Sequence, residues 1–129
     1  MTTTKILLNS VLSTKNAKFL TLDIKNMYLQ TDLDQYEYMR IPFSLLPNEI
    51  ITLHNLKERE SNGWIYVEIR KGIYGLPQAG ILAHKNLSKV LTAANFYPAV
   101  HTPGLWLHKT RPIQFSLVVD NFGVKYALR

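Results

Sequence analysis

The chain has 129 residues and contains no cysteine, no long apolar run and very little acid in its second half. The lack of cysteine excludes disulfide bonds and thiolate metal sites, and it fits a reducing compartment. No apolar stretch approaches the roughly 18 residues of a membrane span, and the first residues lack the apolar segment of a signal peptide. The sequence therefore predicts an intracellular protein, in the cytoplasm or nucleus, with no membrane partner.

What the chain does contain is the composition of a globular protein. Apolar residues make up 47% of it and charged residues 19%, so a core can form and bulk disorder is not expected. A length of 129 residues suits one ordinary domain and is too short for two. We therefore expect a single domain over residues 1–129.

Acidic residues are nearly missing after Glu68, where Asp120 is the only one. Residues 69–129 hold eight lysines or arginines, whereas residues 1–68 hold seven basic and eight acidic residues. The net charge of +6 therefore belongs almost wholly to the second half. A basic surface attracts nucleic-acid phosphates through counterion release, although the same residues can also form a merely solvated face. Charge alone makes nucleic-acid binding one candidate function.

Helix and strand patterns alternate along the chain, which predicts an α+β fold. Helices are expected at 5–13, within 44–56 and at 78–95, and strands at 18–23, 36–41, 64–69, 115–120 and 124–127. The apolar face of the long helix would consist of Ala83, Leu87, Val90, Leu91 and Ala94. Turns are expected at 62–63 and 121–123, so that residues 120 and 121 lie at a hairpin tip. This order favours an antiparallel sheet with helices packed on one face.

Two carboxylates directly follow apolar strand patterns. Asp23 comes after Phe19–Leu22, and Asp120 comes after Phe115–Val119. Strand ends that are far apart in the sequence can meet in a folded sheet, and paired carboxylates are a common way to build a magnesium site. Taken singly, each aspartate is better explained as a turn or cap residue.

Three motifs occur in a definite order. The first, Phe19–Leu29, is a strand that ends in Asp23 and has the aromatic Tyr28 five residues further on. The second, Ile73–Gly80, is a loop that leads into a helix, and the third, Phe115–Gly123, is the hairpin with the second carboxylate. In order, spacing and strand context they resemble the palm of a reverse transcriptase, specifically that of LTR retrotransposons of the copia-like type. The similarity extends over nearly the whole chain.

The resemblance implies an RNA-directed DNA polymerase from the Gag-Pol polyprotein of a transposable element. Such an enzyme performs two-metal nucleotidyl transfer from deoxynucleoside triphosphates onto a primer paired with an RNA or DNA template. By resemblance, Asp23 and Asp120 would hold two magnesium ions, with the backbone carbonyl of Ile24 as a further ligand. Tyr28 would be the steric gate that excludes the ribose 2′-hydroxyl, and Gln78 would help to position the incoming nucleotide.

Other roles fit the same residues. Tyr28 is also compatible with a core aromatic residue, and Gln78 with a polar residue in the first turn of a helix. The glycines of the second motif do not indicate a phosphate-binding loop, because no Gly-Lys-Ser/Thr follows them.

Asn121 stands where the family has a second aspartate in its catalytic hairpin. The amide is neutral and offers one carbonyl oxygen beside its NH₂ donors, so a site built for three carboxylates lacks one negative charge. Complete fingers and thumb do not fit in 129 residues, so the resemblance implies a partial palm domain. We expect the isolated chain to be inactive or nearly so. A non-catalytic basic nucleic-acid-binding module and a structural α+β protein without a ligand are the alternatives.

Overall fold

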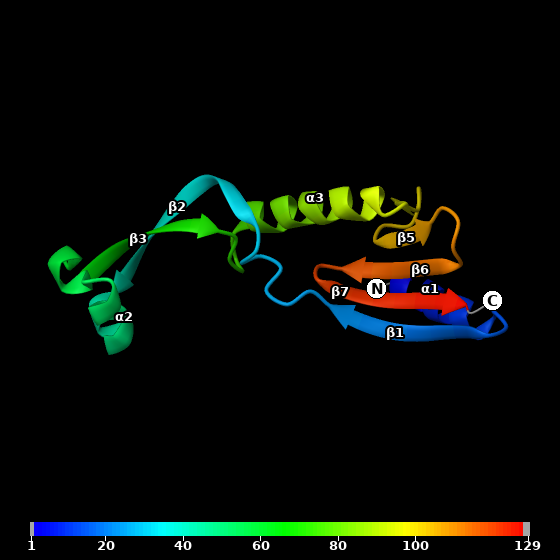
Figure 1. Cartoon of the computed structure of the whole chain (residues 1–129), viewed down its shortest axis with the longest axis horizontal. Helices are drawn as coiled ribbons and strands as arrows, with labels where there is room; N and C mark the ends of the chain where they lie inside the picture. The colour runs from blue at the N-terminus through cyan, green and yellow to red at the C-terminus, as the bar shows by residue number, and fades with distance from the viewer. Residues whose placement is uncertain (1, 128–129) are drawn as a thin grey trace.

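The computed structural model describes residues 2–127, which form an elongated molecule with two regions (Figure 1). Residues 32–71, which we call the arm, form a projecting two-stranded hairpin capped by short helices. Residues 2–31 and 72–127, which we call the body, form a five-stranded sheet with two helices. The predicted α+β class, with a mostly antiparallel sheet and helices, is confirmed.

The elements follow one another in this order: α1 (Thr2–Leu12), β1 (Ala17–Asp23), β2 (Asp32–Pro42), η1 (Phe43–Leu45), α2 (Asn48–Leu53), η2 (Leu56–Arg59), β3 (Trp64–Lys71), α3 (Pro77–Ala93), β4 (Phe96–Pro98), β5 (Leu105–His108), β6 (Ile113–Val118) and β7 (Asn121–Ala127). The sequence patterns missed β4 and β5, which have only three and four residues. Strands that short carry too few alternations to give a periodic signal. In the described part of the chain, no helix has the length and apolar character needed to cross a membrane.

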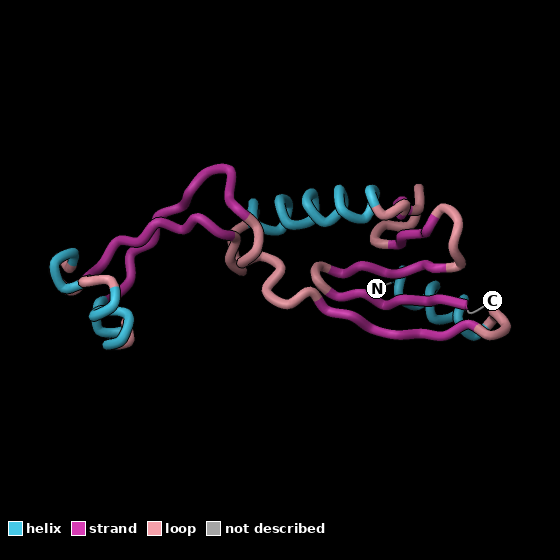
Figure 2. Tube along the Cα trace, in the orientation of Figure 1, coloured by secondary structure: helices cyan, strands magenta, loops and turns pink. Residues whose placement is uncertain are grey.

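The body sheet has the strand order β1-β7-β6-β5-β4, and all its neighbours are antiparallel. The early strand β1 therefore pairs with the last strand, β7, while the intervening arm projects away from the sheet (Figure 2). This pairing joins two segments from nearly opposite ends of the chain, and it sets the geometry of the candidate site.

An aromatic cluster forms the core of the body between the sheet and α3. Phe115 lies at its centre, with ring centroids 5.2 Å from Phe96, 5.1 Å from Phe122 and 6.2 Å from Trp106. Leu91 of α3 belongs to the same buried cluster. Burial of large aromatic side chains is a major source of folding free energy, so this cluster fixes the face of the sheet that α3 covers.

The two helices of the body lie on opposite faces of the sheet. Val124 packs against the cluster beneath α3, whereas the neighbouring Lys125 is buried toward α1, where its ammonium donates hydrogen bonds to the hydroxyls of Ser10 and, at 2.8 Å, of Thr14. Successive residues of a strand point to opposite faces. The prediction of helices on one face is therefore wrong. A helical pattern shows which side of a helix is apolar, and it does not show which face of a sheet that side covers.

Local sequence signals explain the limits of α3. It begins with Pro77, whose fixed φ suits the first helical position, and it is followed by Asn95 in the left-handed region at φ 67°. Its predicted apolar face is only partly right. Leu91 is buried, but Val90 is 64% exposed and Ala94 is exposed, because the sheet covers a narrower stripe of the helix than the pattern indicated.

The turn between β6 and β7 lies earlier than predicted. Asn121 already belongs to β7 and pairs with Val118, so Val119 and Asp120 alone form the connection. Val119 has φ 59°, an unusual conformation for a β-branched residue. The predicted turn at 121–123 is wrong.

Gly123, which suggested that turn, is needed for packing inside the strand. A Cβ atom there would lie 2.9 Å from Ser116 Oγ and 3.1 Å from Phe19 Cζ. Strand glycines commonly mark such close approaches, so Gly123 indicates tight packing within β7 and not a turn.

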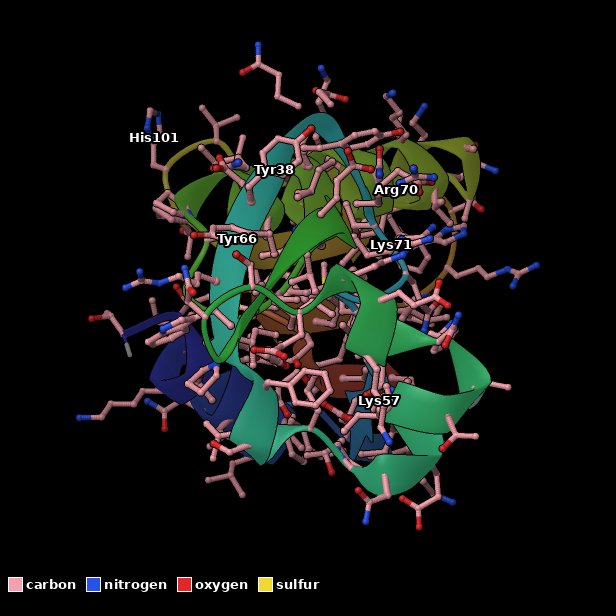
Figure 3. All side chains as sticks on the ribbon, turned by 90° about the vertical axis from the view of Figure 1, so that its left-hand side faces the viewer. Tyr38, Lys57, Tyr66, Arg70, Lys71 and His101 are labelled. Atoms are coloured by element: carbon pink, nitrogen blue, oxygen red, sulfur yellow. The ribbon has the colours of Figure 1, made fainter. Side chains whose placement is uncertain are left out.

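The arm has little core of its own. Strands β2 and β3 pair antiparallel, with a register shift between Asp32 and Glu37. Ile65 is only 2% exposed, whereas Tyr38 and Tyr66 are 72% and 67% exposed. Seen from the arm end of the molecule, the labelled Tyr38 and Tyr66 lie on the hairpin strands (Figure 3). Most of the hairpin surface is therefore open to solvent.

Candidate functional site

The pairing of β1 with β7 brings the residues of the first and third motifs together. Asp23, the last residue of β1, lies opposite Asn121, the first residue of β7. The backbone N–H of Ile24 donates a hydrogen bond of 3.0 Å to the carbonyl of Asp120. Asp23, Ile24, Asp120 and Asn121 thus meet at one end of the sheet.

The Asp120 carboxylate is half-buried, and both of its oxygens accept hydrogen bonds from neighbouring side chains. The Asn121 amide donates to Oδ1 at 2.8 Å, and the Tyr74 hydroxyl donates to Oδ2 at 3.1 Å. The pKa of Tyr74 is raised above its ordinary value, first because of this hydrogen bond and then through desolvation and the negative charge of Asp120. The carboxylate is therefore held from two sides.

The sequence gives no signal that distinguishes Tyr74, apart from its place in the second motif. A tyrosine in a glycine-rich loop gives no sign of which acid it will face, because that depends on where the loop lies relative to the sheet. The only available signal was its place beside residues already assigned to a nucleotide site.

Tyr28 lies next to Tyr74 and lines a cavity with it. The two rings meet edge to face, with centroids 4.6 Å apart and planes at 79°. Together with the loop that precedes α3, they line an open cavity of about 330 Å³. Gly72 lets this loop come close, because a Cβ there would lie 2.8 Å from the backbone oxygen of Tyr28. The first and second motifs therefore share one hollow beside Asp120.

Gln78 lines a different hollow. Its amide donates a 2.6 Å hydrogen bond to the Glu37 carboxylate of the arm, and both residues border a cavity of about 390 Å³. The contact connects the start of α3 to β2. The structure thus groups Gln78 with the arm, and Tyr28 with Tyr74 and Asp120.

The donors at the end of the sheet have the chemistry that magnesium prefers. Asp23 and Asp120 supply hard anionic oxygens, and the Ile24 carbonyl is a further oxygen of the same type. Between residues 2 and 127, however, no three side chains of His, Cys, Asp or Glu are grouped as a metal site. Asn121 adds no negative charge. In type and number, the donors fit one magnesium ion better than two.

No family model, curated protein or solved structure matches the chain. Function therefore has to be inferred from the residues and their geometry.

Charge is divided unevenly between the two regions. Residues 32–71 of the arm carry seven acidic and five basic residues, whereas the described body carries nine basic residues and only Asp23 and Asp120 as acids. Lys85 and Lys89 lie along an open groove of about 890 Å³ on α3, beside His84. The body is thus the basic part of the molecule, and its only two acids are those of the candidate site.

Proposed function

We propose that the chain is a palm segment of a reverse transcriptase of the copia-like LTR-retrotransposon type, and that its site serves nucleotidyl transfer onto a primer–template. The observation that carries this proposal is the β1–β7 register. It brings Asp23 opposite Asn121 and links Ile24 to Asp120, so the acids of two separate motifs lie at one sheet end. In a body with only two acidic residues, such a meeting is hard to explain by solubility.

The residues around this point take complementary roles in the proposal. Asp23 and Asp120 hold magnesium, with the Ile24 carbonyl as a neutral ligand. When bound, magnesium would stabilise the negative charge that develops on the attacking oxygen and on the leaving pyrophosphate. Tyr28 faces the sugar of the incoming nucleotide from the cavity that it shares with Tyr74.

The basic body supplies the surface for the primer–template in this proposal. Eight of its nine basic residues are exposed and neutralise phosphates there, since only Lys125 is buried. The arm, with more acids than bases, contributes little to this attraction. Gln78 is bonded to Glu37, so its contact with a nucleotide requires that this hydrogen bond opens. We expect the isolated chain to bind nucleic acid while extending primers poorly or not at all.

The test combines magnesium titration with nucleic-acid binding. Magnesium should raise the thermal unfolding midpoint of the wild-type chain, and Asp23→Asn should remove this rise. Asp34→Asn, which neutralises an exposed carboxylate of the arm, is the matched control and should keep it. Affinity for a fluorescent RNA–DNA primer–template should fall steeply with salt, as expected for a site that releases counterions.

The second candidate is a non-catalytic nucleic-acid-binding module. It is favoured because Asn121 carries no negative charge, and because in the described chain no third acid is grouped with Asp23 and Asp120. Salt-sensitive binding of the primer–template, with an equal response of wild type and Asp23→Asn to magnesium, would favour the module and overturn the polymerase proposal.

A further inference from the structure

We propose that Tyr74 is a positioning residue that holds Asp120 in a closed arrangement of low metal affinity until the neighbouring cavity is filled. This inference rests on the proposed function and concerns the regulation of the same site. In the closed arrangement, the Tyr74 hydroxyl and the Asn121 amide each bind one oxygen of the carboxylate.

The carboxylate oxygens that these donors occupy are the ones that a cation needs. An ionised aspartate is purely an acceptor, and a hydrogen-bond donor competes with a cation for its lone pairs. Asn121 also takes the place beside Asp120 where another carboxylate would attract the ion. The contacts therefore lower the affinity of Asp120 for magnesium because they occupy its oxygens. Asn121 also contributes no negative charge that would attract the ion.

The backbone of Asp120 has little freedom to escape this arrangement. Its carbonyl accepts the hydrogen bond from Ile24, and it lies in a two-residue connection next to Val119, whose φ is 59°. Opening of the carboxylate therefore depends mainly on its side-chain partners.

Tyr74 is the partner that can move. Its side chain is 67% exposed, and its ring is held by an edge-to-face contact with Tyr28. Gly75, the next residue, has φ 95° and nothing within 4 Å of a Cβ position, so the loop has space on that side. Loss of one hydroxyl contact frees Asp120 Oδ2 without disturbing the sheet.

The cavity provides the trigger. Tyr28 and Tyr74 both line it, so a nucleoside triphosphate that enters it contacts the ring that restrains Asp120. Displacement of Tyr74 then makes the carboxylate available to the metal. Because such coupling is reciprocal, bound magnesium should also strengthen binding of the nucleotide. Tyr74 would thereby make metal binding depend on the presence of substrate.

Isothermal titration of the full chain with magnesium alone tests the closed state. Tyr74→Phe keeps the ring and removes only the hydroxyl, so it should bind magnesium roughly tenfold more tightly than wild type, as expected for the loss of a hydrogen bond to a charged group. Asn121→Ala should give a gain in the same direction. Tyr66→Phe, which removes an exposed hydroxyl of the arm, is the control and should leave the affinity unchanged.

A second titration, with deoxynucleoside triphosphate present, tests the trigger. The nucleotide should tighten magnesium binding more in wild type than in Tyr74→Phe, since the variant is already open. Combining Asp120→Asn with Tyr74→Phe should abolish the tighter magnesium binding in the first titration and the effect of the nucleotide in the second.

The outcomes separate the two proposals. Equal magnesium affinities of wild type, Tyr74→Phe and Asn121→Ala, each dependent on Asp120, would overturn the closed state and leave the polymerase site standing. Magnesium binding that does not depend on Asp120 in any variant would overturn the polymerase site itself.

Discussion

The body and the arm are both built from antiparallel strands, yet they bury their side chains to very different extents. In the body, a five-stranded sheet packs against α3, and Phe115 in the core between them is 3% exposed. In the arm, two strands leave Tyr38 and Tyr66 largely in solvent. An isolated two-stranded hairpin is at best marginally stable in water. The comparison indicates that the body supplies the rigid platform for Asp23 and Asp120, while the arm is the less stable element.

The two tryptophans allow this difference to be measured. Trp106 is buried in the core of the body. Trp64 lies in the arm, where the guanidinium carbon of Arg40 is 4.1 Å from the centroid of the Trp64 ring. Trp64→Phe therefore leaves a fluorescence reporter for the body, and Trp106→Phe leaves one for the arm.

The largest expected effect comes from the core of the body. Phe115→Ala should lower the free energy of unfolding by about 3–5 kcal/mol, because it removes a buried ring and leaves a cavity. Denaturant titration in the Trp64→Phe background measures this loss. Tyr66→Ala in the arm should change the body by less than about 0.5 kcal/mol. If Phe115→Ala, made separately in the Trp106→Phe background, shifts the Trp64 transition by the same amount, the two regions unfold as one unit and the comparison fails.

A pair of glycines gives a smaller, matched contrast. Gly104 of the body and Gly63 of the arm have similar φ values of 77° and 81°. Alanine at either position should cost about 1–2 kcal/mol for the left-handed backbone. At Gly104 a Cβ would also lie 2.8 Å from the carbonyl oxygen of Leu117, whereas at Gly63 nothing lies within 4 Å.

Gly104→Ala should therefore cost about 1–3 kcal/mol more than Gly63→Ala, since overpacking adds to the backbone strain. The Leu117 backbone is held in place because its N–H bonds Gly104 O at 2.7 Å. Urea midpoints of the two variants, each read from the tryptophan of its own region, measure the difference. Equal losses would show that the body can relax as freely as the arm.

The smallest expected effect concerns the pH dependence of the arm. The pKa of Glu68 is lowered, first by the hydrogen bond from Arg70 and then by that from Tyr38. The folded arm thus binds this proton more weakly than the unfolded chain does. Its contribution to stability is present above the ordinary pKa of 4.5 and is lost as the pH falls through the lowered value. The group is exposed, so the effect is small.

Thermal unfolding in the Trp106→Phe background, read from Trp64 as the solution is acidified, measures this dependence. Glu68→Gln should flatten the acid side of the profile for the arm, and the profile of the body should stay unchanged. An identical acid profile for wild type and Glu68→Gln would show that these contacts do not stabilise the arm.

Much of the local structure was predictable because it depends on neighbours in the sequence. The apolar run before Asp23 predicted β1, the run before Asp120 predicted β6, and the helix expected within 44–56 is present as α2. The turn before β7 was misplaced because Gly123 serves packing against Phe19, which lies far away in the sequence. Local signals therefore succeeded where local contacts decide the structure.

The candidate site also divides into features that local sequence predicts and features that long-range packing decides. Asp23 and Asp120 could be selected as strand-end acids, and the resemblance named Tyr28 and Gln78. Which of these residues meet could not be read from the pattern, because it depends on how distant segments pack. Gln78 contacts Glu37, and Tyr74 joins Tyr28 to Asp120.

The sequence by itself determined the α+β class, the basic second half and the positions of two acids after apolar strands. Only the tertiary structure decided that α1 and α3 cover opposite faces, that β1 pairs with β7, and that Tyr74 and Asn121 hold Asp120. Periodicity and charge are properties of neighbouring residues, whereas strand pairing and side-chain contacts depend on the burial of surfaces that are distant along the chain.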